Sequence, residues 1–457
     1  MSQRSFLIRG SVQAPDGALR PGSADAPARI TSHRLLTPGR ARDGVTGELR
    51  GTADEIVRVE LENGFELWTR ADALVREHGR RSLARDGGDA WEFDSLAPAT
   101  TDPSRGERGL VGLGIRVLEF FGVRVEEKAA SKLGRWFEDR KLEGGRPGLH
   151  ALNLDGDFAL SALADGETLP AGRGPLLIFL HGTASSTRGS FGKLWAADNA
   201  AGREARARLA GAYGGRAFAY EHRSLTESPV HNALELVRRL PQDAEVHLVS
   251  HSRGGLVGEL LCLGECEGVA GLLDDSRLDT LFAADRTIAA QLGLLPLSPE
   301  ALAERDEAYD RDREALAELL AELATRKPRV TRFARVACPA RGTTLASGRL
   351  DRWLSMLNFL AGKALGASPF ADALEFLLAV VKERTDPRTL PGLEAMMPGS
   401  ALTRLLHHPE LVCAADLSVI AGDVEGDSAW QKIKLLVTDW FYGADHDLVV
   451  NTGSMSG

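Results

Sequence analysis

The sequence predicts an α/β fold in which a mainly parallel sheet is covered by helices on both faces. Short apolar runs typical of buried strands occur at "GPLLIFLHG", "RAFAYEH", "EVHLVSHS" and "DLSVIAGD". Stretches with helical periodicity, including "NALELVRRL" and "GLVGELLCL", separate most of these runs. Such alternation is typical of parallel strands, because each one needs a crossover to reach the next. An antiparallel hairpin turning at Asp155-Gly156, in "LHALNLDGDFALSAL", is expected to begin the sheet.

Composition narrows the classes of partner. The 457 residues carry a formal net charge of -9 with a pI near 5.8, so no basic surface for nucleic acid is expected. No segment has the length and apolarity of a membrane span, and no signal peptide is recognised, so we expect a cytoplasmic protein. The 4 cysteines are too scattered for a disulfide framework. No motif indicates a cofactor or a metal site, so none is predicted.

Four regions are expected along the chain. Residues 1–50, rich in Gly, Pro and Arg, are predicted to be partly ordered. Residues 51–104 are predicted to form a small β-rich module, because alternating runs flank the hairpin signal Asn63-Gly64. Residues 105–146 are predicted to form two connecting helices, and residues 147–457 the main domain.

An insertion is expected within the main domain, at residues 268–330. Its second half has the signals of one long helix, with Ser298 as N-cap, Pro299 at the first helical position and basic residues at its end. Two interpretations stay open: a largely solvated helix, which we favour, or a mobile cover over a site.

Ser252 is the candidate nucleophile. "EVHLVSHSRGGLVGELL" reads as strand, tight turn and helix, and a serine at such a turn presents its hydroxyl at the carboxyl edge of the sheet. Residues 250–254 fit G-x-S-x-G except that Ser250 replaces the first glycine. The alternative is that Ser252 merely caps the following helix.

These motifs carry a family resemblance. "FLHGTASS", "AYEHRSLTESPVHNALELV", "VSHSRGG", "ACPARGTTLA", "LPGLEAMMPGS" and "DHDLVVNTGS" occur in the order found in lipase-like α/β-hydrolases. From about residue 147 onward the chain resembles that superfamily. In detail it is similar to bacterial hydrolase-like domains that precede caspase-like CHAT protease modules. The resemblance implies an α/β-hydrolase fold and a serine nucleophile.

The resemblance also implies an oxyanion hole. The main-chain N–H groups of Thr183 and Arg253 are expected to face the developing oxyanion. His181 is expected to brace its loop. His251 is expected to be a spacer within the turn, because adjacent side chains diverge there.

The catalytic acid implied by the resemblance lies in "HDLVVNTGS". Asp447 matches the acid of the lipase pattern, although Leu448 stands where that pattern has glycine. Asp445 and Asp423 are the alternatives, the second because other α/β-hydrolases place their acid at that point. Loop capping alone would explain both alternatives.

The base is the open question, because the order in this fold is Ser, acid, His and no histidine follows Asp447. Three explanations are considered, in this order of preference. The C-terminal strand and histidine segment lie beyond residue 457; the domain has lost catalysis; or His446 serves as the base.

Two classes of function follow. The first is a lipase- or esterase-like serine hydrolase that cleaves an ester, thioester or amide of a small-molecule or acyl substrate through an acyl-enzyme. The second is a non-catalytic hydrolase-fold module that binds a protein partner, such as a downstream protease-like domain, or senses a ligand.

Overall fold

The structure is a computed structural model in which the chain divides into two compact units. Among the described residues, those up to Leu133 belong to the first unit and those from Gly134 onward to the second. Each unit is described by itself. The residues described are 3–13, 28–38, 46–52, 55–61, 66–78, 80–83, 89–92, 95–96, 113–125, 129–266, 269, 274, 276–282, 299–342, 390–397, 399–409, 411 and 414–420.

The first unit is built on a nine-stranded sheet with the order β5-β4-β9-β2-β1-β7-β6, where β3 pairs with β1 and β8 with β9. The predicted hairpin is confirmed, because β4 and β5 pair antiparallel with Ile56 opposite Arg70. The elements are β1 (Gln3–Gln13), β2 (Ala28–Pro38), β3 (Thr46–Thr52), β4 (Ile56–Leu61), β5 (Glu66–Arg70), α1 (Ala71–His78), β6 (Arg80–Leu83), β7 (Asp89–Glu92), β8 (Ser95–Leu96) and β9 (Leu113–Val125).

Two expectations for this region differ from the structure. Residues 1–50 contribute strands β1, β2 and part of β3, and β2 pairs with β9 from Ala28 opposite Val125 to Leu36 opposite Leu118. The first of the two helices expected in residues 105–146 is the strand β9, whose β-branched and aromatic residues favour a sheet. The sheet therefore crosses the boundaries expected at residues 51 and 104. The second helix is present as α2 (Ala129–Lys141).

The second unit contains a mixed seven-stranded sheet with the order β11-β10-β13-β12-β14-β15-β16. The hairpin β10/β11 is antiparallel, as predicted, and β12 to β16 run parallel to one another. The prediction of an α/β fold with a mainly parallel sheet agrees with this arrangement. Strand β15 is not among the strands that the sequence predicts. Its strands are β10 (Gly148–Leu152), β11 (Leu160–Ala162), β12 (Leu176–Leu180), β13 (Ala217–Glu221), β14 (Glu245–His251), β15 (Arg329–Val336) and β16 (Asp416–Ile420).

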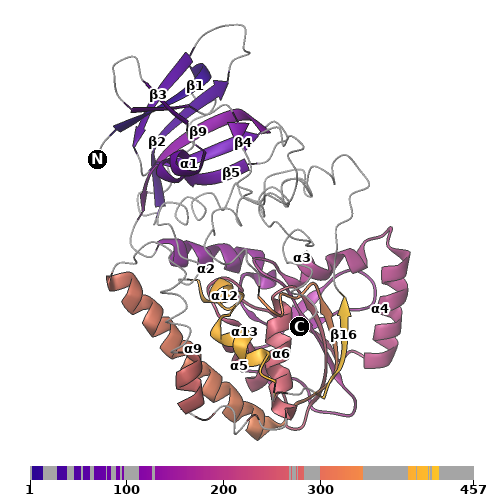
Figure 1. The fold of residues 1–457 in the computed structure, drawn as a ribbon. Helices are drawn as coiled ribbons and strands as arrows, with labels where there is room; N and C mark the ends of the chain where they lie inside the picture. The colour runs from indigo at the N-terminus through magenta and orange to yellow at the C-terminus, as the bar shows by residue number, and fades with distance from the viewer. Residues whose placement is uncertain are drawn as a thin grey trace, which may run out of the picture. The chain divides into compact units, whose positions relative to one another are not determined.

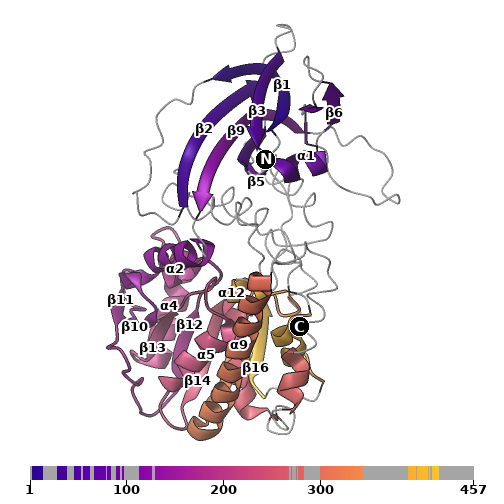
Figure 2. The same ribbon diagram turned by 90° about the vertical axis from the view of Figure 1, so that its left-hand side faces the viewer.

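Helices cover both faces of this sheet (Figure 1). One face presents Phe179, Ala219 and Val249 to α3 and α4, whereas Phe333 on the other face packs against Gly258 of α6. Figure 2 looks onto the face that α5 and α9 cover. The helices are α3 (Thr187–Phe191), α4 (Ala200–Tyr213), α5 (Pro229–Arg238), α6 (Gly254–Cys262), α9 (Pro299–Arg326), α12 (Pro391–Glu394) and α13 (Ala401–Leu406).

The long helix predicted in the insertion is α9, and it begins and ends where its capping signals indicated. The preferred interpretation of a largely solvated helix is wrong for its second half. Tyr309, Leu316, Leu319 and Leu323 are buried at helical spacing, because they form an apolar stripe on the side where α9 packs with α5. Across the part of the chain that the structure describes, no helix combines the length and apolarity needed to cross a membrane.

Candidate functional site

Ser252 lies at a sharp turn between the central strand β14 and helix α6. Its φ angle is 51°, in the left-handed region that non-glycine residues seldom adopt. Its N–H donates to Val336 O at 2.8 Å, and its carbonyl accepts from Gly255 N at 2.9 Å. The backbone therefore leaves the sheet and enters the helix within two residues, as the strand-turn-helix pattern predicted.

The hydroxyl of Ser252 does not cap α6. The N-cap residue of that helix is Arg253, and no side-chain hydrogen bond caps it. Among the described residues, no partner hydrogen-bonds to Ser252 Oγ, and Ser252 is partly exposed. The helix-cap interpretation is therefore wrong, and helix capping does not account for the strained backbone at Ser252.

The two predicted oxyanion donors share one feature. Gly182 N donates to Ser190 Oγ at 3.2 Å and Ala184 N donates to Ser224 Oγ at 2.8 Å, whereas the intervening N–H of Thr183 has no acceptor among the described residues. The N–H of Arg253 likewise has none within that part of the chain. Both groups thus lack a hydrogen-bond acceptor in the described part of the chain, while the N–H groups of Gly182, Ala184 and Ser252 are engaged.

The side chain of Arg253 is a buried cation that sequence reasoning missed. It is 0% exposed and donates to three neutral oxygens: Gly392 O at 3.1 Å, Asn232 Oδ1 at 3.0 Å and Glu227 O at 2.6 Å. Burial lowers the pKa of Arg253 to about 10, and the nearby carboxylates of Glu138 and Glu227 oppose that shift. Arg253 thereby joins the turn to α12, to α5 and to the loop after β13.

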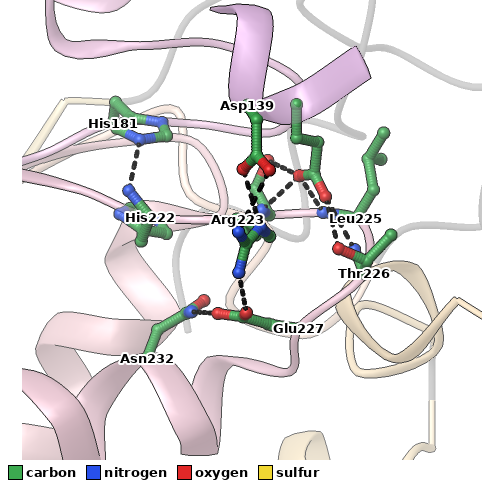
Figure 3. Close-up of polar contacts among 10 residues, drawn as sticks. Asp139, His181, His222, Arg223, Leu225, Thr226, Glu227 and Asn232 are labelled. Carbon is green, nitrogen blue, oxygen red and sulfur yellow. Dashed lines mark hydrogen bonds and ion pairs between the residues drawn. The ribbon is translucent and has the colours of Figure 1, made fainter. Parts of the chain in front are cut away.

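His181 and His222 form a stacked buried pair, with ring centroids 4.0 Å apart (Figure 3). His222 N donates to His181 Nε2 at 3.1 Å, and His181 Nδ1 lies 2.9 Å from Gly182 O. Nδ1 must therefore carry the proton, because a carbonyl only accepts. Burial lowers the pKa of both imidazoles, most strongly that of His222. Since both nitrogens of His181 are engaged, it braces its loop as predicted and is excluded as the base for Ser252.

His251 turns toward α3. Its Nδ1 lies 3.2 Å from Ser190 Oγ, and its ring packs edge-on against Phe191. The hydroxyl of Ser190 also accepts from Gly182 N, so Ser190 contacts both His251 and the loop after β12. This position agrees with the predicted role as a spacer.

A second Ser/His/Asp cluster lies at the start of α5, but its geometry is not that of a triad. Ser228 Oγ and Asp312 Oδ1 both lie 3.1 Å from the same nitrogen, Nδ1 of His231. In a triad the serine and the acid contact opposite ring nitrogens. Ser228 instead caps α5 by accepting from His231 N, and Asp312 raises the pKa of His231.

The predicted acid and base lie outside the described residues. This applies to Asp423, Asp445, His446 and Asp447. The strand before Asp423 is described: the carboxyl end of β16 lies beside that of β15, and Ala337 N donates to Ile420 O at 2.9 Å. Val336, the neighbour of Ala337, accepts from Ser252 N, so β16 ends at the same sheet edge as the turn at Ser252.

The described residues contain no group of three or more His, Cys, Asp or Glu side chains arranged to hold a metal ion. Cys262, Cys266 and Cys338 are buried, and none of them forms a disulfide within the described residues. Burial raises the pKa of Cys338 to about 12, so this thiol stays protonated at neutral pH.

Comparisons with known proteins give one family. The family model described as "Domain of unknown function (DUF7379)" matches residues 151–271 and 313–457. No curated protein matches the chain. Among solved structures, a lipase from Bacillus licheniformis aligns with 63% of this chain and 80% of its own at 13% identity, with a TM-score of 0.28.

Proposed function

Because the chain belongs to the family described as "Domain of unknown function (DUF7379)", whose description names no activity, we propose a function from the site itself: a serine hydrolase with an α/β-hydrolase fold. Ser252 Oγ attacks the carbonyl carbon of an ester, thioester or amide, and its proton passes to a histidine. The leaving group departs with a proton from that histidine. Water then cleaves the acyl-serine bond.

One observation carries the proposal. At the turn between β14 and α6, a residue with φ of 51° holds a hydroxyl that caps no helix, and two neighbouring N–H groups have no acceptor in the described part of the chain. Strain of this kind costs about 1–3 kcal/mol and persists at functional sites, where it preorganises a reactive group. A serine that served only the helix would accept a hydrogen bond from the first turn.

For the acid, the described strands favour Asp423 over Asp447. Asp423 soon follows Ile420, which ends at the same sheet edge as Ser252. With Asp423 as the acid, His446 falls in the chain order Ser, acid, His. In this pairing the histidine is distant in sequence from its acid, whereas His446 is directly adjacent to Asp447. Asp447 with a histidine in a longer chain is the second pairing.

Reaction with a fluorophosphonate probe tests the nucleophile, with the modified residue mapped by peptide mass spectrometry. We expect modification of Ser252 and none in Ser252→Ala. Ser250→Ala is the matched control, because Ser250 is a buried serine on β14, just before the turn, and its hydroxyl has no hydrogen-bond partner among the described residues. This control should react as the wild type does. Absence of reaction in the folded wild-type chain would contradict the proposal and favour the binding module.

A second set of variants separates the two pairings. Hydrolysis of p-nitrophenyl butyrate is measured for Asp423→Asn, Asp447→Asn and His446→Gln. Under the first pairing, Asp423→Asn and His446→Gln each lower kcat by about 10⁴-fold, as in other triads, and Asp447→Asn is mild. The reverse ranking of the two aspartates supports Asp447. Retained activity in His446→Gln excludes His446 as the base.

A further inference from the structure

The loop between β13 and α5 contacts both segments that hold the predicted oxyanion donors. Ser224 Oγ accepts from the N–H of Ala184, the residue after Thr183, at 2.8 Å. Glu227 O accepts from the guanidinium of Arg253 at 2.6 Å. One loop therefore connects the two donor segments, although they follow different strands.

This loop is held by a carboxylate from a distant helix. Glu138, on α2, is 2% exposed. Its Oε1 accepts from Ser224 N at 2.5 Å, Leu225 N at 2.6 Å and Ser224 Oγ at 3.2 Å. Its Oε2 accepts from Thr226 N at 3.0 Å and Thr226 Oγ1 at 2.7 Å. Five donors of three consecutive loop residues therefore surround one carboxylate.

The hydrogen-bond directions along this path are determined. Ala184 N can only donate, so Ser224 Oγ accepts from it, and the single hydroxyl proton of Ser224 then goes to Glu138. The carboxylate thus orients the hydroxyl whose lone pair holds Ala184. Ala184 has a φ angle of 49°, an unfavourable conformation that this hydrogen bond helps to maintain.

A neighbouring ion pair anchors the same loop without joining this path. Asp139 receives Nε and Nη2 of Arg223 at 2.8 and 3.1 Å, and Arg223 also contacts Glu227 (Figure 3). Among the described residues, neither the Asp139 nor the Arg223 side chain hydrogen-bonds to Ser224 or Ala184. Asp139 is therefore a matched control, because it lies on the same helix as Glu138 and anchors the same loop.

We propose that Glu138 is a positioning residue that fixes the Thr183 N–H for oxyanion binding through Ser224 and Ala184. The inference rests on the proposed function, because an oxyanion forms only if Ser252 attacks a carbonyl. Glu138 touches no substrate. It acts by holding a donor where the negative charge develops, and the gain from such a donor depends on its geometry.

The first test compares kinetics of the full chain with p-nitrophenyl butyrate. Glu138→Gln and Ser224→Ala are each expected to lower kcat by about 10- to 100-fold with KM within about twofold, since a displaced donor weakens the transition state alone. Asp139→Asn should keep kcat within about threefold. The double variant Glu138→Gln/Ser224→Ala should be no slower than the slower single variant, because both changes break one path.

The second test does not need catalysis. Amide hydrogen exchange is measured for a peptide covering residues 182–186 and for one covering α6. Glu138→Gln and Ser224→Ala should speed exchange in the first peptide and leave the second unchanged, and Asp139→Asn should change neither. If Glu138→Gln does not fold, the kcat and the hydrogen exchange of Ser224→Ala decide whether the positioning role holds.

The outcomes separate the two proposals. Faster exchange in residues 182–186 with an unreactive wild type would remove the hydrolase function and keep the positioning path. An active wild type in which Glu138→Gln and Ser224→Ala change neither kcat nor exchange would overturn the positioning role. Equal effects of Asp139→Asn and Glu138→Gln would also overturn it, since any anchor of the loop would then suffice.

Discussion

Gly182 lies so close to Ser252 that a Cβ atom on Gly182 would stand 3.0 Å from the Cβ of Ser252. The same Cβ would stand 3.1 Å from Nδ1 of His251. This contact brings the end of β12 against the turn after β14. It places Thr183, the residue after Gly182, beside the candidate nucleophile.

We predict that Gly182→Ala destabilises the protein by about 1–3 kcal/mol, because the added methyl group must push the two turns apart. It should also slow the fluorophosphonate reaction. Urea unfolding and probe kinetics check this. Gly211→Ala is the control: Gly211 lies on α4 with open space around its Cα, and alanine there should stabilise the helix by about 0.5–1 kcal/mol. An unchanged stability of Gly182→Ala would show that the turns are not in contact.

The left-handed backbone of Ser252 gives a second prediction. Ser252→Gly should be more stable than Ser252→Ala by about 1 kcal/mol, because glycine adopts a positive φ angle without the strain that a Cβ imposes. Both variants lack the hydroxyl, so the difference reports the backbone alone. Thermal unfolding of the two variants side by side measures it. A more stable alanine variant would mean that residue 252 has an ordinary backbone conformation.

Arg253 provides a third prediction. Arg253→Met leaves three buried oxygens without their donor, and we expect a loss of about 3–5 kcal/mol. Arg208→Met is the comparison, since Arg208 is an exposed residue of α4 whose one ion pair within the described residues is with Glu204, and its loss should cost at most about 0.5 kcal/mol. Denaturant unfolding distinguishes the two. Similarly small losses of stability in the two variants would contradict the buried hydrogen-bond network of Arg253.

The buried pair of histidines makes stability depend on pH. Both folded pKa values lie below the model-compound value of 6.5, so on acidification the unfolded chain takes up protons before the folded chain does. The stabilising contribution is complete above pH 6.5 and decreases as pH falls below it. Unfolding free energies from pH 7.5 to about 5 test this, and His222→Phe should show a shallower decrease. An equally steep decrease in that variant would assign the acid sensitivity to other groups.

How far the sequence predicts this fold depends on the length and flanks of each apolar run. The strands around "LLIFL" and "VHLVS" are short, bounded by turn residues and followed by helical periodicity, so their type and place could be predicted. The run "LGIRVLEFFGVRV" is wrongly predicted to be a helix, because its apolar residues suit a helix as well as a strand. Pairing with β2 makes this run a strand, and pairing between distant segments cannot be predicted from local periodicity.

The residues of the candidate site also differ in how far the sequence predicts them. The sharp turn at Ser252 could be predicted, because it follows directly on β14 and its chemistry is local, while the roles of Ser252 and Thr183 stay predictions. The buried side chain of Arg253 and the carboxylate of Glu138 could not. Both are charged residues of a kind usually exposed, and only the tertiary fold shows that they are buried with their partners.

The hydrogen bond from Ser252 N to Val336 O joins two residues far apart in the sequence. During synthesis the segment around Ser252 leaves the ribosome well before β15 does, and until then nothing on the other side of β14 holds the turn. The turn at Ser252 therefore gains its contact with Val336 only after β15 has joined the sheet.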